Sequence, residues 1–290
     1  MKPVVHPNWL KDPVRITEGY SLEVTAKDTV ALAEVAPRIW LEAPIAIPFL
    51  PGEGNTARIE AAKAVRAAGF EPMPHFSARR IESFEEFDAY LKAAIEEASV
   101  RRCFVVAGDP SMPAGPFADT SSLIATGAFE EAGIKVIGIG GHPEGHPVMS
   151  EEECWQVLEA KCADVERRGM AALIVTQFAF DPDLILAWLK DLRSRGLDQA
   201  VRIGVPGPAG IKTLTRYAAM CGVSASASVL AKYGLSIGRL LGTAGPDKFV
   251  DRLAEGLGPE HGAVRLHFYP FGGLAKTVDW IQAYEARLPR

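Results

Sequence analysis

The chain has 290 residues, of which 48% are hydrophobic and 23% charged, and its formal net charge is -5. This composition can supply a large buried core and argues against a disordered chain. The sequence shows no basic stripe of the kind that nucleic-acid-binding proteins carry, and no apolar run approaches the ~20 residues of a membrane span. We therefore expect a globular protein with no nucleic-acid or membrane partner.

The N-terminal residues and the cysteines indicate the cellular compartment. Residues 1–12 lack the apolar segment that a signal peptide requires. The four cysteines, Cys103, Cys154, Cys162 and Cys221, are scattered without the C-x-x-C spacing of metal or redox sites. We interpret them as buried or helix-face thiols in a reducing compartment. The sequence predicts a cytoplasmic protein and is compatible with a homo-oligomer.

Short apolar runs alternate with amphipathic helical stretches along the whole chain. The runs that predict β-strands are Tyr20–Thr25, Pro44–Leu50, Glu71–Ser77, Arg102–Gly108, Lys135–Gly141, Ala171–Phe178, Arg202–Pro206 and Val264–Phe271. Helical spacing between them predicts helices that include Thr56–Ala68, Phe84–Ala98, Glu151–Arg168 and Pro182–Arg195.

Capping signals mark the starts of several of these helices. Ser83 with Glu86, and Ser150 with Glu153, have the spacing of a capping box. Asp181 precedes a proline, which predicts an N-cap followed by proline at the first helical position. These signals favour regular alternation of strand and helix.

Alternating strands and helices predict a parallel sheet covered by helices. Eight such units without a linker favour a closed (β/α)8 TIM barrel, which we expect to form a single catalytic domain over residues 1–290. The connection Gly207–Gly262, between the last two strands, is longer than the others. It predicts an extended helical insertion at the barrel rim, with helices Ile211–Met220, Ser226–Leu241 and Asp247–Leu257.

Polar residues at the C-terminal strand ends are the candidates for an active site in such a barrel. In the first strand Ser21, Glu23 and Thr25 alternate with Leu22 and Val24, so the polar set is expected to point inward. An inward carboxylate is costly unless it is paired or protonated, and burial raises its pKa, which suits a general acid. A purely structural carboxylate, hydrogen-bonded to barrel groups, is the alternative.

Four of the six histidines fall on predicted strands or at their ends: His75, His142, His146 and His267. His142 and His146 have the spacing of a metal-ligand pair, but a proline follows each of them and disfavours the helix that such a pair needs. Together with His75 and Asp109 they leave a metal-dependent lyase or hydrolase as an alternative. Stoichiometric zinc or iron in the purified protein would favour that alternative.

Short motifs at successive strand ends together resemble the methylenetetrahydrofolate reductase family, whose fold is a (β/α)8 barrel. The matching segments are Ser21–Glu23, Pro74–Ser77, Gly108–Pro110, His142–Pro147, Thr176–Phe178, Pro206–Gly207 and His267–Tyr269. The resemblance implies an oxidoreductase of one-carbon metabolism that acts on a CH–NH group. It would interconvert 5,10-methylene- and 5-methyl-tetrahydrofolate by hydride transfer, usually through bound FAD that NADH or NADPH reduces.

The resemblance also implies roles for individual residues. Glu23 matches the general acid, which helps to open the methylene bridge to a reactive iminium. Asp109, Gln177 and Phe178 match substrate-binding residues, and Asp109 and Gln177 suit a pterin edge that presents donors and acceptors. The implied cofactor-binding residues are His75, Ser77, Gly108, His142, His146 and Lys161.

Departures from the family fall mainly on flavin-contact positions. Ala107 replaces the arginine of an Arg-Gly-Asp run, Pro48–Gly52 replaces a Thr-Tyr-Gly segment, His142 replaces a tyrosine and Gly273 an arginine. Folate binding is thus better supported than FAD binding, and direct hydride transfer from NAD(P)H is a hypothesis. A flavin absorption band with flavin-dependent turnover would contradict it. A non-catalytic folate-binding barrel is a further alternative, which a Glu23→Gln variant separates because only an enzyme would lose activity.

Overall fold

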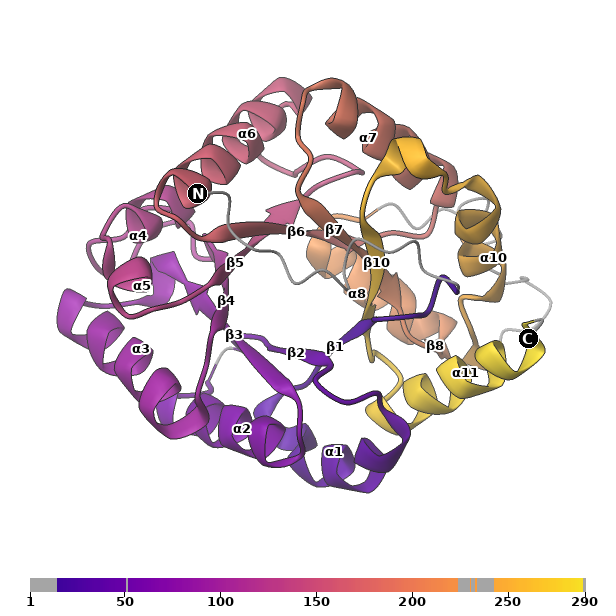
Figure 1. Ribbon diagram of the computed structural model, residues 1–290, viewed down its shortest axis with the longest axis horizontal. Helices are drawn as coiled ribbons and strands as arrows, with labels where there is room; N and C mark the ends of the chain where they lie inside the picture. Colours follow the sequence, from indigo (N-terminus) through magenta and orange to yellow (C-terminus); the bar gives the residue numbers. More distant parts are fainter. Residues whose placement is uncertain (1–14, 51, 224–229, 231–232, 234–242, 289–290) are drawn as a thin grey trace.

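The computed structural model describes residues 15–50, 52–223, 230, 233 and 243–288. Parallel strands close into a barrel in the order β1-β10-β7-β6-β5-β4-β3-β2 (Figure 1). They are β1 (Ser21–Glu23), β2 (Pro44–Ile47), β3 (Glu71–Ser77), β4 (Arg102–Val106), β5 (Val136–Gly141), β6 (Ala171–Phe178), β7 (Ala200–Pro206) and β10 (Val264–Tyr269). The predicted TIM barrel is confirmed.

Most helices surround the barrel on its outer side (Figure 1). The outer helices are α1 (Thr29–Val35), α2 (Asn55–Ala67), α3 (Phe84–Ala98), α4 (Thr120–Ile124), α5 (Ala128–Glu131), α6 (Glu151–Arg167), α7 (Pro182–Ser194), α10 (Asp247–Gly256) and α11 (Leu274–Arg287). The helix α8 (Ile211–Cys221) instead lies behind the strands, near the middle of the view. Short 3-10 turns are η2 (Ala26–Asp28), η3 (Ala36–Arg38), η4 (Ala78–Arg80) and η6 (Pro259–His261). Within the described ranges, none of the helices combines the length and apolar character needed to cross a membrane.

Two predicted capping signals have different outcomes. At α6 the box is reciprocal: Ser150 Oγ accepts from the Glu153 amide at 3.3 Å, and Glu153 Oε2 accepts from the Ser150 amide at 2.7 Å. At α3, Ser83 Oγ accepts from the Glu86 amide at 3.1 Å. The Glu86 carboxylate accepts from the amide of Glu82 at 2.7 Å instead of returning to the N-cap residue. The second box is therefore only half formed.

The long connection between β7 and β10 contains a feature that the sequence did not predict. A two-residue strand β8 (Ala209–Gly210) pairs antiparallel with β9 (Thr243–Ala244). The predicted helices at α8 and α10 are present. The predicted helix Ser226–Leu241 lies outside the described residues except for Leu230 and Tyr233. Tyr233 is buried, and its hydroxyl donates to the carbonyl of Pro206 at 2.7 Å, which fixes the end of β7.

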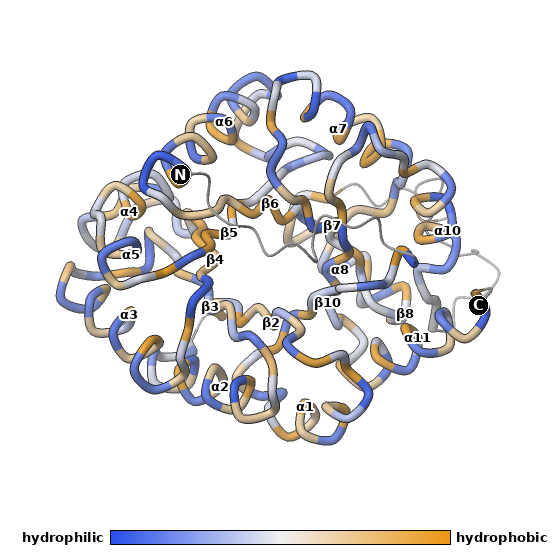
Figure 2. Tube along the Cα trace, viewed as in Figure 1, coloured by the Kyte–Doolittle hydropathy of each residue, from blue (hydrophilic) through white to orange (hydrophobic). Residues whose placement is uncertain are grey.

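Apolar side chains form two separate clusters because successive strand residues point to opposite faces. The strands form apolar segments in the middle of the molecule, and the helices alternate between polar and apolar residues (Figure 2). The larger cluster lies between strands and helices. The smaller one fills the barrel interior with Ala46, Met73, Phe104, Leu173 and Val175.

The barrel interior is tightly filled around β4 and β5. A Cβ atom on Gly138 would lie 2.3 Å from a ring carbon of Phe104, so only glycine leaves room for that ring. The phenyl ring of Phe104 also contacts the imidazole of His75, with ring centroids 4.6 Å apart. This packing forms the floor on which the polar residues at the C-terminal strand ends rest.

The strand register decides which polar side chains face inward. Cα partners are Ser21 with His267, Glu23 with Ala46, and His75 with Phe104. Directly paired residues of neighbouring strands point to the same side of a sheet. Because Ala46 and Phe104 belong to the interior cluster, Glu23 and His75 also face the barrel interior.

The packing of the outer core predicts how much stability is lost when one of its large buried side chains is removed. Phe76 is fully buried, and its ring centroid lies 4.8 Å from that of Tyr90 and 5.2 Å from that of Phe129. We expect Phe76→Ala to lower the free energy of unfolding by about 3–5 kcal/mol in chemical denaturation, since it leaves a cavity in a packed cluster. Phe84, at the start of α3 and 54% exposed, is the matched control, for which Phe84→Ala should cost no more than about 1 kcal/mol. Equal losses for both variants would contradict this account of the core.

Candidate active site at the barrel mouth

Glu23 ends β1 at the boundary between the barrel interior and solvent, where its side chain is 20% exposed. Its Oε2 lies 3.9 Å from Nε2 of His267 on β10, which is 2% exposed. The other ring nitrogen of His267, Nδ1, lies 2.8 Å from Oγ of the buried Ser21. The inward orientation predicted for Glu23 and Ser21 is present, and His267 links the two.

His75 on β3 joins this group from the other side. Burial lowers the pKa of His75 to about 4, although the charge of Glu23 acts in the opposite direction. Burial likewise lowers the pKa of His267, again against the effect of Glu23. Both imidazoles are therefore neutral at neutral pH. They can exchange hydrogen bonds with Glu23, but they do not neutralise its charge.

Tyr269 holds the His267 ring in place. The two rings meet edge to face, with centroids 4.8 Å apart and an interplanar angle of 90°. The Tyr269 hydroxyl donates to the carbonyl of Thr176 at 3.1 Å, and burial raises its pKa well above the usual value. Tyr269 is thus an uncharged brace between β10 and β6.

Gln177 lies at an irregularity of β6, where the pairing with β7 shifts register between Val175 and Phe178. Such bulges reorient side chains next to active sites. The Gln177 Oε1 atom accepts from the Phe178 amide at 3.1 Å, which leaves the amide NH2 without a bond to this strand. The ring of Phe178 packs edge to face against those of Tyr269 and Phe271, so Phe178 belongs to the outer core and supports the brace.

Two cavities flank the loop His142–Pro147. One, of about 280 Å³, is also lined by Gln177, Phe178 and Cys221. The other, of about 520 Å³, lies on the other side of the loop against Trp155 and its neighbours. Burial, and secondarily the charge of Glu23, raises the pKa of the Cys221 thiol, which indicates that the first cavity lies near Glu23. Ligand pockets typically measure roughly 300–1,000 Å³, so the two cavities together suffice for a sizeable ligand.

The β5–α6 side of the mouth combines two neutral imidazoles with one cation. The rings of His142 and His146 meet with centroids 4.9 Å apart. Burial lowers the pKa of His142 to about 4, and it also lowers the pKa of His146. Lys161 on α6 is half-buried, and burial lowers its pKa. The charge of Asp119 opposes this shift, and the charge of Lys161 in turn contributes to lowering the pKa values of His142 and His146.

Asp109 follows β4 but stands apart from Glu23. Its side chain is 72% exposed, and its Oδ1 accepts from Nε of Arg80 at 2.9 Å. The Arg80 guanidinium lowers the pKa of Asp109, so the carboxylate stays ionised. Gly108 has a φ of +91°, and a Cβ there would lie 2.3 Å from Oγ of Ser77. Gly108 and Ser77 are therefore in close contact and set the path of the chain into Asp109.

The segment after β2 fills the neighbouring part of the rim with protein contacts. The guanidinium carbon of the buried Arg58 lies 4.1 Å from the Phe49 ring centroid and 4.6 Å from that of Tyr90. Arg58 also donates to the carbonyl of His75 at 3.3 Å. The guanidinium carbon of Arg80 lies 5.0 Å from the same Phe49 ring. Both arginines on this side are thus engaged within the protein.

These contacts bear on the FAD that the sequence resemblance implies. The pyrophosphate of a dinucleotide needs a cation or amide donors, and Lys161 fits this requirement. Flavin and nicotinamide dinucleotides share that pyrophosphate, so this fit applies to both. On the β2 side, within the described residues, Arg58 and Arg80 are engaged by the Phe49 ring, the His75 carbonyl and the Asp109 carboxylate. The donor set fits a dinucleotide phosphate and gives no separate support for a flavin ring.

The metal-site alternative has no geometric basis in the described part of the chain. No three histidine, cysteine, aspartate or glutamate side chains within it are grouped so that they could hold a metal ion. His75 faces Glu23, whereas Asp109 is held at the surface by Arg80. The four residues of that alternative therefore do not converge.

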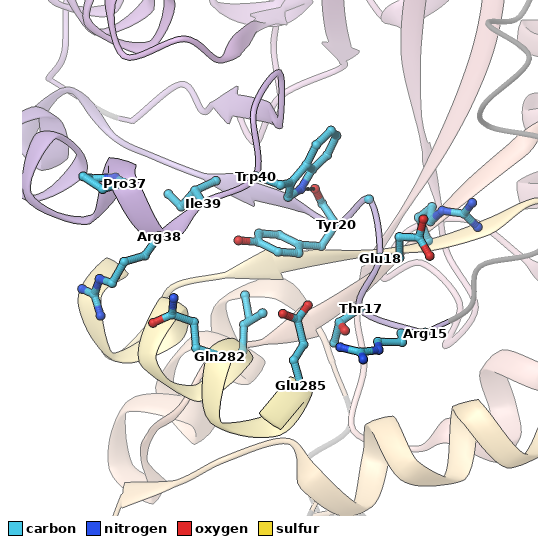
Figure 3. A pocket seen from close by; sticks show the side chains of 13 residues that line it. Arg15, Thr17, Glu18, Tyr20, Pro37, Arg38, Ile39, Trp40, Gln282 and Glu285 are labelled. Atoms are coloured by element: carbon cyan, nitrogen blue, oxygen red, sulfur yellow. Dashed lines mark hydrogen bonds between the residues drawn. The ribbon is translucent and has the colours of Figure 1, made fainter. Parts of the chain in front are cut away.

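A larger cavity, of about 670 Å³, lies at the opposite end of the barrel between the start of β1, the segment after α1, and α11 (Figure 3). Tyr20 and Trp40 form one wall, with ring centroids 6.4 Å apart, and Glu285 lies on α11. The N-terminal face of a TIM barrel ordinarily serves stability, and catalysis occurs at the C-terminal face. The mouth that holds Glu23 is therefore the candidate active site.

Sequence reasoning missed several residues of the mouth. Tyr269 could have been found, because it lies two residues beyond His267 on one strand and so shares its face. Cys221 follows from no local signal, since it reaches the cavity from α8 in the long connection. The pairing of Arg80 with Asp109 joins two separate loops and has no sequence signature.

Comparison with known proteins agrees with this fold. The family model described as methylenetetrahydrofolate reductase matches residues 51–269, which is more than half of the chain. A dihydropteroate synthase from Thermus thermophilus superposes with a TM-score of 0.51 at 13% identity, over 96% of both chains. A second structure of that synthase, in complex with 6HMPPP, has a TM-score of 0.49 at 12% identity, over 95% of both chains. At 13% identity, the likeness to the first of these two structures shows the barrel fold alone. The family match shows that this chain belongs to the methylenetetrahydrofolate reductase family.

Proposed function

We propose that the protein is a folate oxidoreductase that interconverts 5,10-methylene- and 5-methyl-tetrahydrofolate by hydride transfer. The observation that carries this proposal is Glu23, an inward carboxylate at the barrel mouth that has the neutral imidazoles of His75 and His267 beside it. A carboxyl group that faces the interior of the mouth is placed to serve as the general acid that this family-level chemistry needs.

The acid step assigns a defined task to Glu23. The protonated carboxyl gives its proton to a nitrogen of the methylene bridge. The carbon–nitrogen bond breaks, its electron pair stays on that nitrogen, and an iminium carbon forms. A hydride then adds to this carbon and yields the methyl group. In the reverse direction the Glu23 carboxylate takes the proton back.

We propose that Gln177 and Asp109 bind the pterin. The Gln177 NH2 group can donate to a ring acceptor, because its oxygen is already engaged by the Phe178 amide. The ionised Asp109 can accept from ring N–H groups, and Arg80 fixes its orientation. Asp109 contacts the substrate from the outer rim, whereas Gln177 lines the cavity near Glu23.

We further propose that the hydride passes directly from NAD(P)H to the folate. Lys161 would hold the pyrophosphate of the dinucleotide, and His142 and His146 would pack against it as uncharged donors or acceptors. The filling of the β2 side by Phe49 and Arg58 favours a carrier that does not need a flavin site there. In this proposal the protein aligns donor and acceptor and excludes water.

If Glu23 is the general acid, its replacement should lower the rate of turnover but leave folate binding intact. Glu23→Gln keeps the size of the side chain but removes the acid, so kcat should fall by roughly 10²–10⁴-fold. The dissociation constant of 5-methyltetrahydrofolate, measured by calorimetry, should stay within a few-fold of the wild-type value. Glu34→Gln, on the exposed face of α1, is the matched control and should leave both quantities unchanged. Full activity of Glu23→Gln would remove the acid role, and a non-catalytic binding barrel would show no turnover in either variant.

The role of Lys161 predicts a separate effect on the dinucleotide. Lys161→Met keeps the length of the side chain and removes the charge, so the KM for NAD(P)H should rise by about 10-fold or more, as expected for a lost charge-assisted bond. Steady-state kinetics at saturating folate measure this effect. Lys190→Met, at an exposed position of α7, serves as the control. An unchanged KM would show that the pyrophosphate binds elsewhere.

A further inference from the structure

The hydroxyl of Ser21 has two hydrogen-bond acceptors within reach. Its Oγ lies 2.8 Å from Nδ1 of His267 and 3.5 Å from the carbonyl oxygen of Leu266. Ser21 is fully buried and does not reach the cavity, so its hydroxyl is not a nucleophile for a substrate. A hydroxyl has one hydrogen to donate, and it can point to only one of these acceptors at a time.

Each orientation of the Ser21 hydroxyl selects a different tautomer of the neutral His267. When Ser21 donates to Nδ1, the ring proton is on Nε2, which then offers an N–H to the Glu23 carboxylate. When Ser21 donates to the Leu266 carbonyl, it accepts from Nδ1–H, and the bare Nε2 faces Glu23 as an acceptor. The first arrangement favours ionised Glu23, and the second favours protonated Glu23.

We propose that Ser21 and His267 are positioning residues that follow the protonation state of Glu23, with the neutral imidazole carrying its proton on Nε2 when Glu23 is ionised and on Nδ1 when Glu23 is protonated. This inference rests on the proposed role of Glu23 as the acid of the reaction. It explains how one carboxyl group can serve both as proton donor and, in the reverse direction, as proton acceptor. In either state the buried Ser21 and both ring nitrogens keep a hydrogen-bond partner.

The switch between the two arrangements requires no net gain or loss of protons by Ser21 or His267. Ser21 and His267 each keep one exchangeable proton in both states, and only Glu23 gains or loses one. The Nε2–Oε2 separation of 3.9 Å exceeds hydrogen-bond length by about 1 Å. Catalytic hydrogen bonds are often long in the free enzyme and shorten when substrate binds.

The other titratable groups near Glu23 in the described part of the chain do not compete for this role. His75 faces it from β3, and its pKa of about 4 keeps it neutral over most of the working range. Cys221 from α8 and Tyr269 from β10 have raised pKa values and are neutral as well. From β7, Arg202 acts on His267 and disfavours its protonation, which helps to keep that imidazole neutral.

The test is an NMR titration of the full-length protein without ligands. Selective ¹³C labelling of glutamate carboxyls reports the inflection of Glu23, and ¹⁵N labelling of histidine rings reports the tautomers of His267 and, separately, the titration of His75. Glu23→Gln assigns the Glu23 signal. We expect the proton of His267 to move from Nε2 to Nδ1 as pH falls through the Glu23 inflection. A single tautomer over the whole range would overturn the proposal.

Two variants should move the Glu23 inflection in opposite directions. Ser21→Ala removes the acceptor for Nδ1–H, which locks the Nε2–H tautomer and should lower the Glu23 inflection by about one pH unit, the shift expected for a hydrogen bond to a charged group. His267→Leu removes the donor to the carboxylate and should raise the inflection by a similar amount. If His267→Leu does not fold, His267→Gln, whose amide can turn either way, should place the inflection closer to that of the wild type.

A matched control is Thr17→Ala, which removes another fully buried hydroxyl at the opposite end of the barrel and should leave the inflection unchanged. Shifts of the same sign in the Ser21 and His267 variants, or no shift in either, would overturn the inference. The spectra do not depend on turnover, so the outcomes are separable. Opposite shifts without any folate turnover would contradict only the proposed function. Turnover that requires Glu23, without the shifts, would contradict only this inference.

Discussion

The pairing of β1 with β10 is the constraint on which both the fold and the candidate site depend. It joins the first and last strands of the barrel, and it places Ser21 opposite His267. The neighbouring pairing of β1 with β2 places Glu23 opposite Ala46, on the interior face. Because side chains alternate along a strand, a shift of one residue would turn Glu23 toward the helices. The pairing of the three-residue strand β1 thus both closes the barrel and directs the Glu23 carboxylate into its interior.

Charge is distributed unequally along the barrel axis. At the N-terminal end the fully buried Arg202 donates to the carbonyl of Gly19 at 3.0 Å, and burial with the nearby charges of Arg102 and Arg265 lowers its pKa to about 9. At the C-terminal end Glu23 faces neutral imidazoles. The buried cation and the carboxyl group of the candidate site thus lie toward opposite ends of the barrel.

Much of the fold could be predicted from the sequence. Apolar runs predicted the barrel strands to within a few residues, and Phe84–Ala98 agrees with α3 because Ser83 caps it. The short helices α4 and α5 were not predicted, because segments of five and four residues are too short to show a helical period. The β8–β9 pair was not predicted either, because two-residue strands that pair across a long connection leave no local sequence pattern.

The candidate site was predictable only in part, for a similar reason. The inward position of Glu23 followed from the alternation in β1, and the neutral state of His75 follows from burial that no local pattern shows. The outward position of Asp109 depends on Arg80, and the filling of the β2 side depends on stacking of Phe49 on Arg58. Both are contacts between separate segments. Residue types and strand ends can be read from the chain, whereas the partners of a charged group depend on the tertiary structure.

The proposed reaction at this mouth is a direct hydride transfer between NAD(P)H and a folate. The most direct measurement is a single turnover with NAD(P)H deuterated at C4 and 5,10-methylenetetrahydrofolate in ordinary water, followed by mass spectrometry of the product. Direct transfer predicts that the methyl group of 5-methyltetrahydrofolate retains one deuterium. An unlabelled methyl group, as expected for a relay that exchanges its hydrogen with water, or the absence of methyl-folate, would contradict the account.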